Sequence, residues 1–169
     1  HPEAFPPDPH FSRLTGATHA LDVSLWRVGA PASEGVRAMA ETGSTAGLRA
    51  EVEGLGGRAA YVEGDPLRPS PGSAGAVLTV TEARPAATVV SMLAPSPDWF
   101  VGVDGLDLRE GDGWAARVVV DAVVYDAGTD DGASYTAANA PRPARAPVAE
   151  VAYAPLAGTV VGRLVFERQ

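Results

Sequence analysis

The sequence predicts an all-β fold, an antiparallel β-sandwich of about eight strands with two short helical inserts, forming one domain over residues 1–169. Two observations lead to this prediction. The apolar runs are short, and several alternate with polar residues at the period of a strand. Glycine (19) and proline (15) are abundant and separate these runs, which favours many turns over long helices.

The first segment of the chain is rich in proline. Four of the first nine residues are proline, so residues 1–19 are predicted to form an irregular, extended arm laid over the core. Phe5, Phe11 and Leu14 are the expected anchors of this arm. The segment 20–28 then alternates between apolar and polar residues, which predicts the first strand.

Two short helices follow. The first is predicted over residues 33–42, with Ser33 as its N-cap and Gly43 as a left-handed C-terminal exit. Its apolar stripe consists of Val36, Met39 and Ala40. The second helix is predicted over residues 45–54, where Leu48 and Val52 are four residues apart.

The remaining strands are predicted from short apolar or alternating runs between turn-forming residues. They cover residues 58–63, 76–82, 86–93, 100–104, 106–109, 114–124, 148–154 and 159–167. Loops are predicted over residues 64–75 and 131–147, which are rich in turn formers.

Composition excludes several classes of function. The net charge of −8 argues against nucleic-acid binding, which needs clustered basic residues, whereas an acidic surface can gather cations. The absence of cysteine excludes disulfides, thiolate metal sites and cysteine nucleophiles. No apolar run approaches the length of a transmembrane helix. No signal-peptide pattern is present, and a start at His1 is what a mature or trimmed product would show.

Three carboxylates are the candidate metal ligands. Asp98 follows the stiff turn Pro95-Ser96-Pro97 at the end of an apolar run, and Asp126 and Asp130 stand four apart across Gly128. A hard cation such as Ca²⁺ prefers carboxylate, carbonyl and water oxygens, which two such loops at one end of a sandwich can supply. The alternative is that Asp98 and Asp126 only cap turns.

The chain resembles the spondin domain, known from F-spondin and from bacterial spondin-domain proteins. The resemblance runs in order from end to end and rests on several segments, of which Pro95-Ser96-Pro97-Asp98-Trp99 and Asp126-Ala127-Gly128-Thr129-Asp130 are the most specific. Others are His10-Phe11-Ser12, Gly16-Ala17-Thr18-His19, Leu25-Trp26, Ala32-Ser33-Glu34-Gly35-Val36, Gly113-Trp114 and Leu164-Val165-Phe166-Glu167-Arg168.

This resemblance implies a sandwich related to C2 domains that binds Ca²⁺ through Asp98, Asp126 and Asp130. It also implies a strand ahead of the first His-Pro, of the Tyr-x-Val-x-Phe kind, which this sequence lacks. We therefore expect a non-enzymatic, secreted or cell-surface module for adhesion or for ligand and surface binding. Its partner would be an extracellular glycan, lipid headgroup or protein.

Two other functions are open at the level of sequence. His1, with His10 or His19, could bind copper in a redox protein, because a terminal amine and imidazoles suit Cu(II); the alternative is that these histidines brace the arm. A third possibility is an adhesive module that uses an edge strand or the tryptophans Trp26, Trp99 and Trp114, although buried packing is the expected role of these rings. Hydrolase chemistry finds no G-x-S-x-G sequence to support it.

Overall fold

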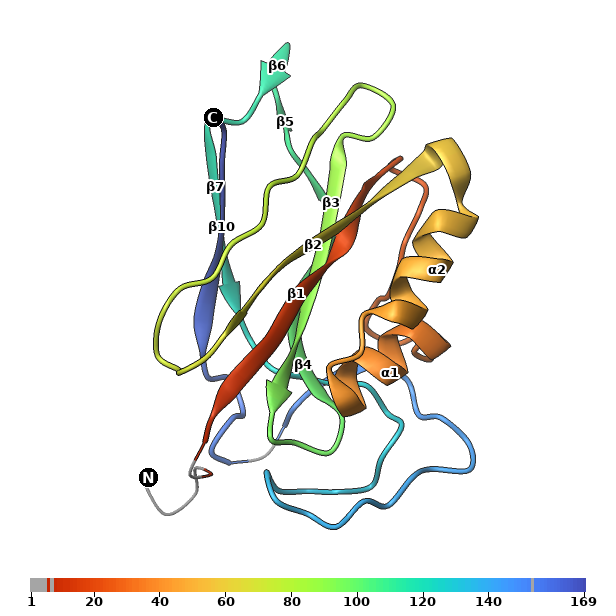
Figure 1. Ribbon diagram of the computed structural model, residues 1–169, viewed down its shortest axis with the longest axis vertical. Coiled ribbons are helices and arrows are strands. Elements are labelled where there is room, and N and C mark those ends of the chain that lie inside the picture. The colour runs from red at the N-terminus through yellow and green to blue at the C-terminus, as the bar shows by residue number, and fades with distance from the viewer. Residues whose placement is uncertain (1–5, 7, 153) are drawn as a thin grey trace.

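The computed structural model describes residues 6, 8–152 and 154–169 (Figure 1). Its main sheet has six antiparallel strands in the order β2-β1-β3-β4-β8-β9. They are β1 His10–His19, β2 Ala59–Leu67, β3 Ala86–Ala94, β4 Trp99–Asp107, β8 Tyr125–Asp126 and β9 Ala149–Glu150. A two-stranded ribbon pairs β7 (Arg117–Ala122) with β10 (Gly162–Glu167), and a small hairpin pairs β5 (Arg109–Glu110) with β6 (Gly113–Trp114). The predicted antiparallel all-β fold with two helices is confirmed.

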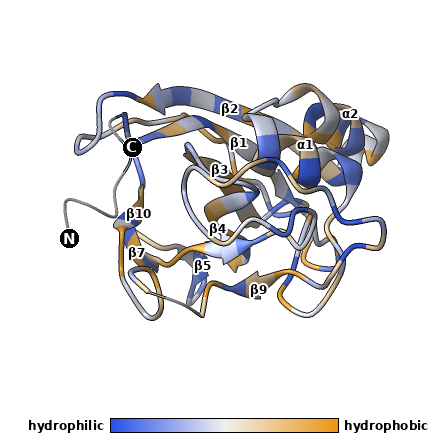
Figure 2. Cartoon of the chain, turned by 90° about the horizontal axis from the view of Figure 1, so that it is seen from below, coloured by the Kyte–Doolittle hydropathy of each residue, from blue (hydrophilic) through white to orange (hydrophobic). Residues whose placement is uncertain are grey.

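The centre of the main sheet is buried on both faces. All nine residues of β3 are buried, and neighbouring residues of β4 enter different clusters. Phe100 packs with the helices on one face, whereas Trp99 and Val101 pack on the other face with Ala122 at the end of β7. Figure 2 shows this layering from below, with β3 and β4 between the helices and the β7–β10 ribbon. The alternation of side chains along a strand therefore builds two cores from one sheet.

The two helices lie within one residue of their predicted ranges. They are α1 Glu34–Thr42 and α2 Ala46–Gly54. Ser33 accepts a hydrogen bond from the N–H of Val36 at 3.2 Å, and Gly43 leaves α1 with a φ of 70°. Glu51 of α2 accepts from the Ser33 hydroxyl and from the N–H of Gly35, both at 2.7 Å, which ties the start of α1 to α2.

The prediction of an irregular N-terminal arm was wrong for residues 10–19, whereas residues 1–5 and 7 lie outside the described residues. Residues 10–19 form β1, which pairs with both β2 and β3 near the middle of the sheet. Strand pairing begins directly after Pro9, and the five residues from Thr15 to His19 are buried, although two of them are threonines. Phe11 does pack against the core as expected, whereas Phe5 lies outside the described residues.

The predicted strand over residues 20–28 was also wrong. This segment forms turns, and Leu21 is 53% exposed. It is fixed instead by the carboxylate of Asp104, which accepts from the Ser24 hydroxyl at 2.8 Å and from the N–H of Leu25 at 3.2 Å. Trp26 then enters the core edge-to-face with Phe100, with ring centroids 5.0 Å apart. These contacts with distant residues, rather than the local alternation of apolar and polar residues, determine the conformation of residues 20–28.

The other predicted strands are present with different limits, except one. Residues 100–104 and 106–109 are mostly one strand, β4, with β5 beginning separately at Arg109. Residues 114–124 form part of β6 and all of β7, and residues 148–154 contain only the short β9. The segment 76–82 is drawn along the sheet in Figure 1 but belongs to no ladder apart from a single bridge between Thr81 and Arg84. In the described part of the chain, no helix combines the length and apolarity needed to cross a membrane.

Candidate metal centre

The loops that carry the three predicted ligands lie side by side. Asp98 ends the turn between β3 and β4, and β8 pairs with β4 so that Asp126 stands opposite Trp99. The N–H of Ala127 donates to the carbonyl of Asp98 at 3.1 Å. The hydroxyl of Ser96 accepts from the N–H of Trp99 at 3.1 Å and so closes the first turn. We call residues 95–98 and 126–130 the acidic loop pair.

Asp98 is the centre of this pair. Its side chain is fully buried, and one carboxylate oxygen, Oδ2, accepts three hydrogen bonds from the opposite loop. The donors are the N–H of Thr129 at 2.7 Å, the Thr129 hydroxyl at 3.1 Å and the N–H of Asp130 at 3.0 Å. The other oxygen, Oδ1, is buried and has no hydrogen-bond partner among the described residues. A buried, unpartnered carboxylate oxygen is costly unless a further group compensates it.

The two other aspartates shape the second loop. Asp126 Oδ1 accepts from the N–H of Gly128 at 2.7 Å, and Gly128 turns the chain with a φ of 73°. Asp130 is buried, and its two carboxylate oxygens accept from the N–H groups of Gly132 and Ala140, both at 2.7 Å. Asp126 therefore caps a turn, as the simpler sequence interpretation expected, and Asp130 caps the next one.

The charges within the acidic loop pair are poorly compensated. Burial and, to a smaller extent, the charge of Asp126 raise the pKa of Asp98 to about 6, although the hydrogen bonds from Thr129 and Asp130 oppose this rise. Burial also raises the pKa of Asp126; the N–H of Gly128 and the Arg142 guanidinium lower it, while Asp130 and Asp131 raise it. A cation at this position would relieve both the burial cost and the repulsion between carboxylates.

The donor set fits a hard cation in its chemistry. It is made only of oxygens, it includes the unpartnered Oδ1 of Asp98, and the charge of Asp126 acts on Asp98. Each oxygen of Asp130 accepts one N–H, and a carboxylate oxygen has a second lone pair. Within the described ranges, however, no three His, Cys, Asp or Glu side chains converge as a complete cage for a metal. Backbone carbonyls and water would have to complete the coordination.

Thr129 is the residue that sequence reasoning missed. It lies between Asp126 and Asp130 and received no role, yet its backbone and its hydroxyl both bind Asp98. It is buried, and this position explains why a threonine occurs in an otherwise acidic turn. The only feature of the sequence that pointed to Thr129 was its hydroxyl group inside the turn. The spacing of the aspartates does not distinguish such a threonine from an ordinary loop residue.

Two of the three histidines, His10 and His19, lie far apart in the structure. His10 and His19 stand at the two ends of β1, which is ten residues long and so spans about 30 Å. His19 is buried; its Nδ1 lies 2.9 Å from the carbonyl of Ala20 and its Nε2 lies 2.7 Å from the Thr88 hydroxyl. His10 contacts the carbonyl of Asp8. The two histidines thus brace β1 at separate places, and His1 lies outside the described residues.

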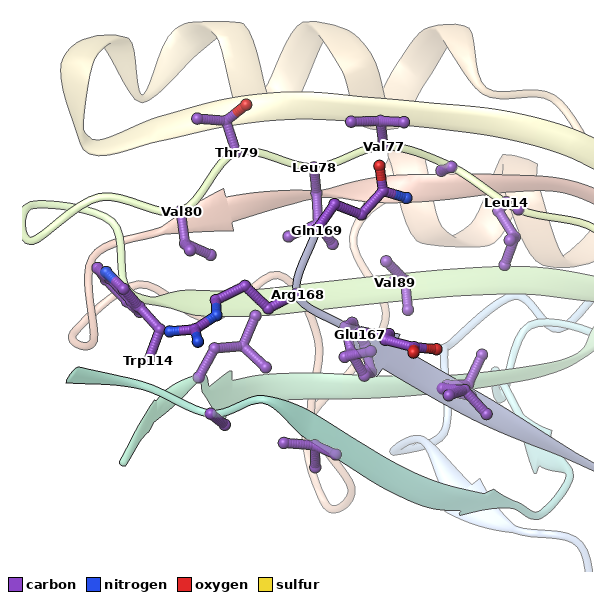
Figure 3. Close-up of a pocket in the computed structure, with 18 of the residues that line it drawn as sticks. Leu14, Val77, Leu78, Thr79, Val80, Val89, Trp114, Glu167, Arg168 and Gln169 are labelled. Carbon is purple, nitrogen blue, oxygen red and sulfur yellow. The ribbon is translucent and has the colours of Figure 1, made fainter. Parts of the chain in front are cut away.

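The tryptophans do not form a common platform. Trp26 and Trp99 are buried in different clusters on opposite faces of the sheet, next to Phe100 and Tyr135 respectively. Trp114 is only half-buried and lines a groove between β10 and residues 74–80 (Figure 3). The expectation of core packing is confirmed for the first two rings.

The fold and the site define a class of protein. It is an antiparallel β-sandwich domain in which two acidic loops between strands lie side by side at one end of the sandwich. The family can be stated as well. The Spondin_N family model matches residues 1–155, and the chain therefore belongs to the spondin N-terminal domain family. The resemblance seen in the sequence is confirmed.

Curated relatives agree with this assignment. The chain is 39% identical to Spondin-2 of Rattus norvegicus and 40% identical to Spondin-2 of Homo sapiens, in each case over 139 residues that cover 80% of this chain and 42% of the relative. It is 36% identical to Spondin-1 of Gallus gallus over 153 residues, which cover 83% of this chain and 19% of that protein. The chain thus spans less than half the length of these relatives.

Proposed function

We propose that this domain is a non-enzymatic, secreted or cell-surface module that binds Ca²⁺ at the acidic loop pair and uses this end of the sandwich to bind an extracellular ligand. The observation that carries the proposal is the fully buried Asp98, whose Oδ1 has no partner in the described part of the chain. Membership in the spondin family supports an extracellular, adhesion-type role.

The chain's own residues would perform three tasks at this site. Asp98 ties the β3–β4 turn to the second loop through the backbone of Thr129 and Asp130. Asp126 and Asp130 keep the turn closed and supply further carboxylate oxygens. A bound Ca²⁺ would supply the positive charge that the site lacks. Because it would bind only the folded domain, it would also stabilise that domain by mass action.

The exposed side of the site would then serve recognition. Asp98 and Asp130 are buried, whereas Asp126 is only partly buried and stands nearest to solvent among the three. A ligand with an anionic group, such as a lipid headgroup, a glycan or a carboxylate of a partner protein, could complete the coordination from that side. Such a ligand would bind only while Ca²⁺ is present.

Thermal unfolding with Ca²⁺ and with a chelator tests the metal site. For the parent chain, Ca²⁺ at a hundred times its dissociation constant should raise the free energy of unfolding by about 2.7 kcal/mol. In Asp98→Asn this gain should disappear, because the amide loses the charge but keeps the shape and the acceptor for Thr129. The matched control is Asp121→Asn, an exposed carboxylate on β7 that pairs with Arg163. The control should respond to Ca²⁺ like the parent.

An equal response of Asp98→Asn and the parent would show that the acidic loop pair is not the Ca²⁺ site. A response to Mg²⁺ as large as that to Ca²⁺ would contradict the choice of ion, because Mg²⁺ needs a more regular octahedral site.

A further inference from the structure

The chain segment 140–146 lies against the second loop of the acidic loop pair, and the two stretches run side by side in Figure 1. Three backbone hydrogen bonds join them: the N–H of Asp131 donates to the carbonyl of Ala140 at 2.9 Å, that of Arg142 to Thr129 at 2.8 Å, and that of Ala146 to Gly128 at 2.8 Å. The carbonyl of Thr129 thus holds the backbone of Arg142, while its N–H and hydroxyl hold Asp98. An arginine is therefore fixed next to the residue that positions the central carboxylate.

Arg142 brings a positive charge to a region of several carboxylates. Its Nε atom is buried and lies 2.6 Å from Oδ1 of Asp131, although the angle is not that of a hydrogen bond. The side chain of Asp131 is 63% exposed, so this partner stands at the surface of the loop. The charge of Arg142 also lowers the pKa of the Asp126 carboxyl, whereas Asp130 and Asp131 raise it. Arg142 thus acts on one carboxylate outside the candidate centre and on one inside it.

This compensation of charge is partial. Among the described residues, no basic side chain forms an ion pair with Asp98, Asp126 or Asp130. The buried Oδ1 of Asp98 also has no hydrogen-bond partner there. A positive charge near Asp126 reduces the repulsion between the carboxylates without occupying the centre. The same charge must repel a divalent cation that binds at the centre, because both charges are positive and close together.

Arg145 offers a comparison on the same segment. Its side chain is 28% exposed, close to the 30% of Arg142. Its guanidinium, however, donates to the carbonyl of Ala32 at 2.8 Å and pairs with Glu34 at the start of α1. The two arginines have the same charge and nearly the same exposure, and they differ in the groups that they contact.

We propose that Arg142 is an internal counter-cation of the acidic loop pair, which stabilises the metal-free loops and lowers their affinity for Ca²⁺. The inference rests on the proposed function, since it concerns Ca²⁺ at the same site. Asp131 moderates the effect by holding the guanidinium on the outer side of the loop. Because the two effects of Arg142 are thermodynamically linked, its contribution to stability falls when Ca²⁺ binds, by the factor by which it weakens the affinity.

Calcium titration calorimetry of the parent and of two matched variants tests the proposal. Arg142→Gln should tighten Ca²⁺ binding by about fivefold or more, because a nearby positive charge is removed. Arg145→Gln changes the net charge of the chain equally and should leave the affinity within about twofold of the parent, because an exposed, distant charge is screened by salt. Circular dichroism identifies a variant that fails to fold.

The exposed partner of Arg142 gives a second test with the opposite sign. Asp131→Asn removes a negative charge near the centre and leaves Asp126 as the carboxylate on which the guanidinium acts. It should weaken Ca²⁺ binding by about threefold or more. In the Arg142→Gln background the same change should have a smaller effect, since no guanidinium is left to release, and the double-mutant cycle measures this difference. Asp131 is exposed, so this variant remains a test if Arg142→Gln does not fold.

Urea unfolding supplies a measurement that starts from the metal-free protein. The stability lost in Arg142→Gln should be larger with a chelator than with saturating Ca²⁺, by the same factor as the change in affinity. The loss in Arg145→Gln should be equal in both conditions.

The outcomes separate this inference from the proposed function. A parent chain that binds no Ca²⁺ would overturn both. Binding by the parent, with Arg142→Gln no tighter than Arg145→Gln, would overturn the role of Arg142 and leave the Ca²⁺ site in place. Weaker binding by Arg142→Gln than by the parent would show that the arginine shapes the loop for the ion and does not oppose it.

Discussion

The acidic loop pair and the groove between β10 and residues 74–80 are both places where distant segments come together, but they differ in how completely their polar groups are used. In the loop pair, Asp98 accepts three hydrogen bonds from Thr129 and Asp130 through one carboxylate oxygen, and its other, buried oxygen is left unpartnered among the described residues. In the groove, two extended backbones run along opposite walls, and no backbone hydrogen bond joins them in the described part of the chain. The first arrangement suits an ion, whereas the second is lined largely by apolar side chains.

The difference shows that charge determines what can bind at one place in this domain, whereas partly exposed apolar surface characterises the other. The loop pair has well-defined geometry but carries excess negative charge, so its partner should be small and positive. The groove has much half-buried apolar surface, so its side chains should contribute less to stability than those of a closed core. Three substitutions or conditions test this contrast.

The largest effect is expected from Gly128→Ala in the loop pair. A Cβ at this position would lie 2.2 Å from the carbonyl oxygen of Ala146, and the φ of 73° is unfavourable for alanine. We expect a loss of about 3–5 kcal/mol in the free energy of unfolding, from strain and overpacking together. The matched change Gly111→Ala, in the β5–β6 turn, has a φ of 58° and nothing within 4 Å of the added Cβ. It should cost only about 1 kcal/mol. Urea unfolding measures both, and equal losses would mean that the loop pair is not tightly packed.

The second effect is the pH dependence of the metal-free protein. Burial raises the pKa of Asp98 from an ordinary value of 3.8 to about 6, so the folded state holds a proton that the unfolded state releases. The resulting stability is fully present below about pH 4 and is lost as the pH rises to about 6, a change of about 3 kcal/mol.

Chemical unfolding in the presence of a chelator, from pH 4 to pH 7, measures this change. The difference between the parent and Asp98→Asn isolates the contribution of Asp98 from that of other carboxylates. If the two proteins show the same slope in this range, the carboxyl of Asp98 does not titrate as its burial requires.

The smallest effect compares two valines. Val124 is 1% exposed in the core next to the loop pair, whereas Val118 lines the groove and is half-buried. Val124→Ala should cost about 2 kcal/mol, and Val118→Ala less than about 1 kcal/mol, because only the first change leaves a closed cavity. Thermal and urea unfolding of both variants make the comparison. A larger loss for Val118→Ala would show that the groove is a closed core.

The sequence predicted the elements whose signals are local. The helix α1 is an example, because Ser33, the apolar stripe and Gly43 act within one or two turns of chain. The strand β3 was equally clear, since its apolar run fits a strand buried on both faces. The family resemblance, carried by the residues around Asp98 and Asp126, identified the loops that the structure brings together.

The failures came from interactions with distant residues. β1 was not recognised in the sequence because it follows a proline-rich stretch and contains two threonines and two histidines. Its neighbours β2 and β3 supply the ladder, and Thr88 bonds the buried ring of His19. Residues 20–28 alternate like a strand, but Asp104 holds them in a turn. The strand predicted over residues 76–82 is absent, because this segment pairs with no neighbouring strand and has only the bridge between Thr81 and Arg84.

By itself, therefore, the sequence determined the fold class, the two helices, the family and the three aspartates of the candidate centre. The tertiary structure decided which segments became central strands, that Thr129 rather than a further carboxylate holds Asp98, and that Arg142 is fixed beside Thr129. The physical reason is range: caps, turns and periodicity act between residues close in the chain. The partners of a buried carboxylate or of a strand edge are instead set by segments tens of residues away, whose meeting depends on the whole fold.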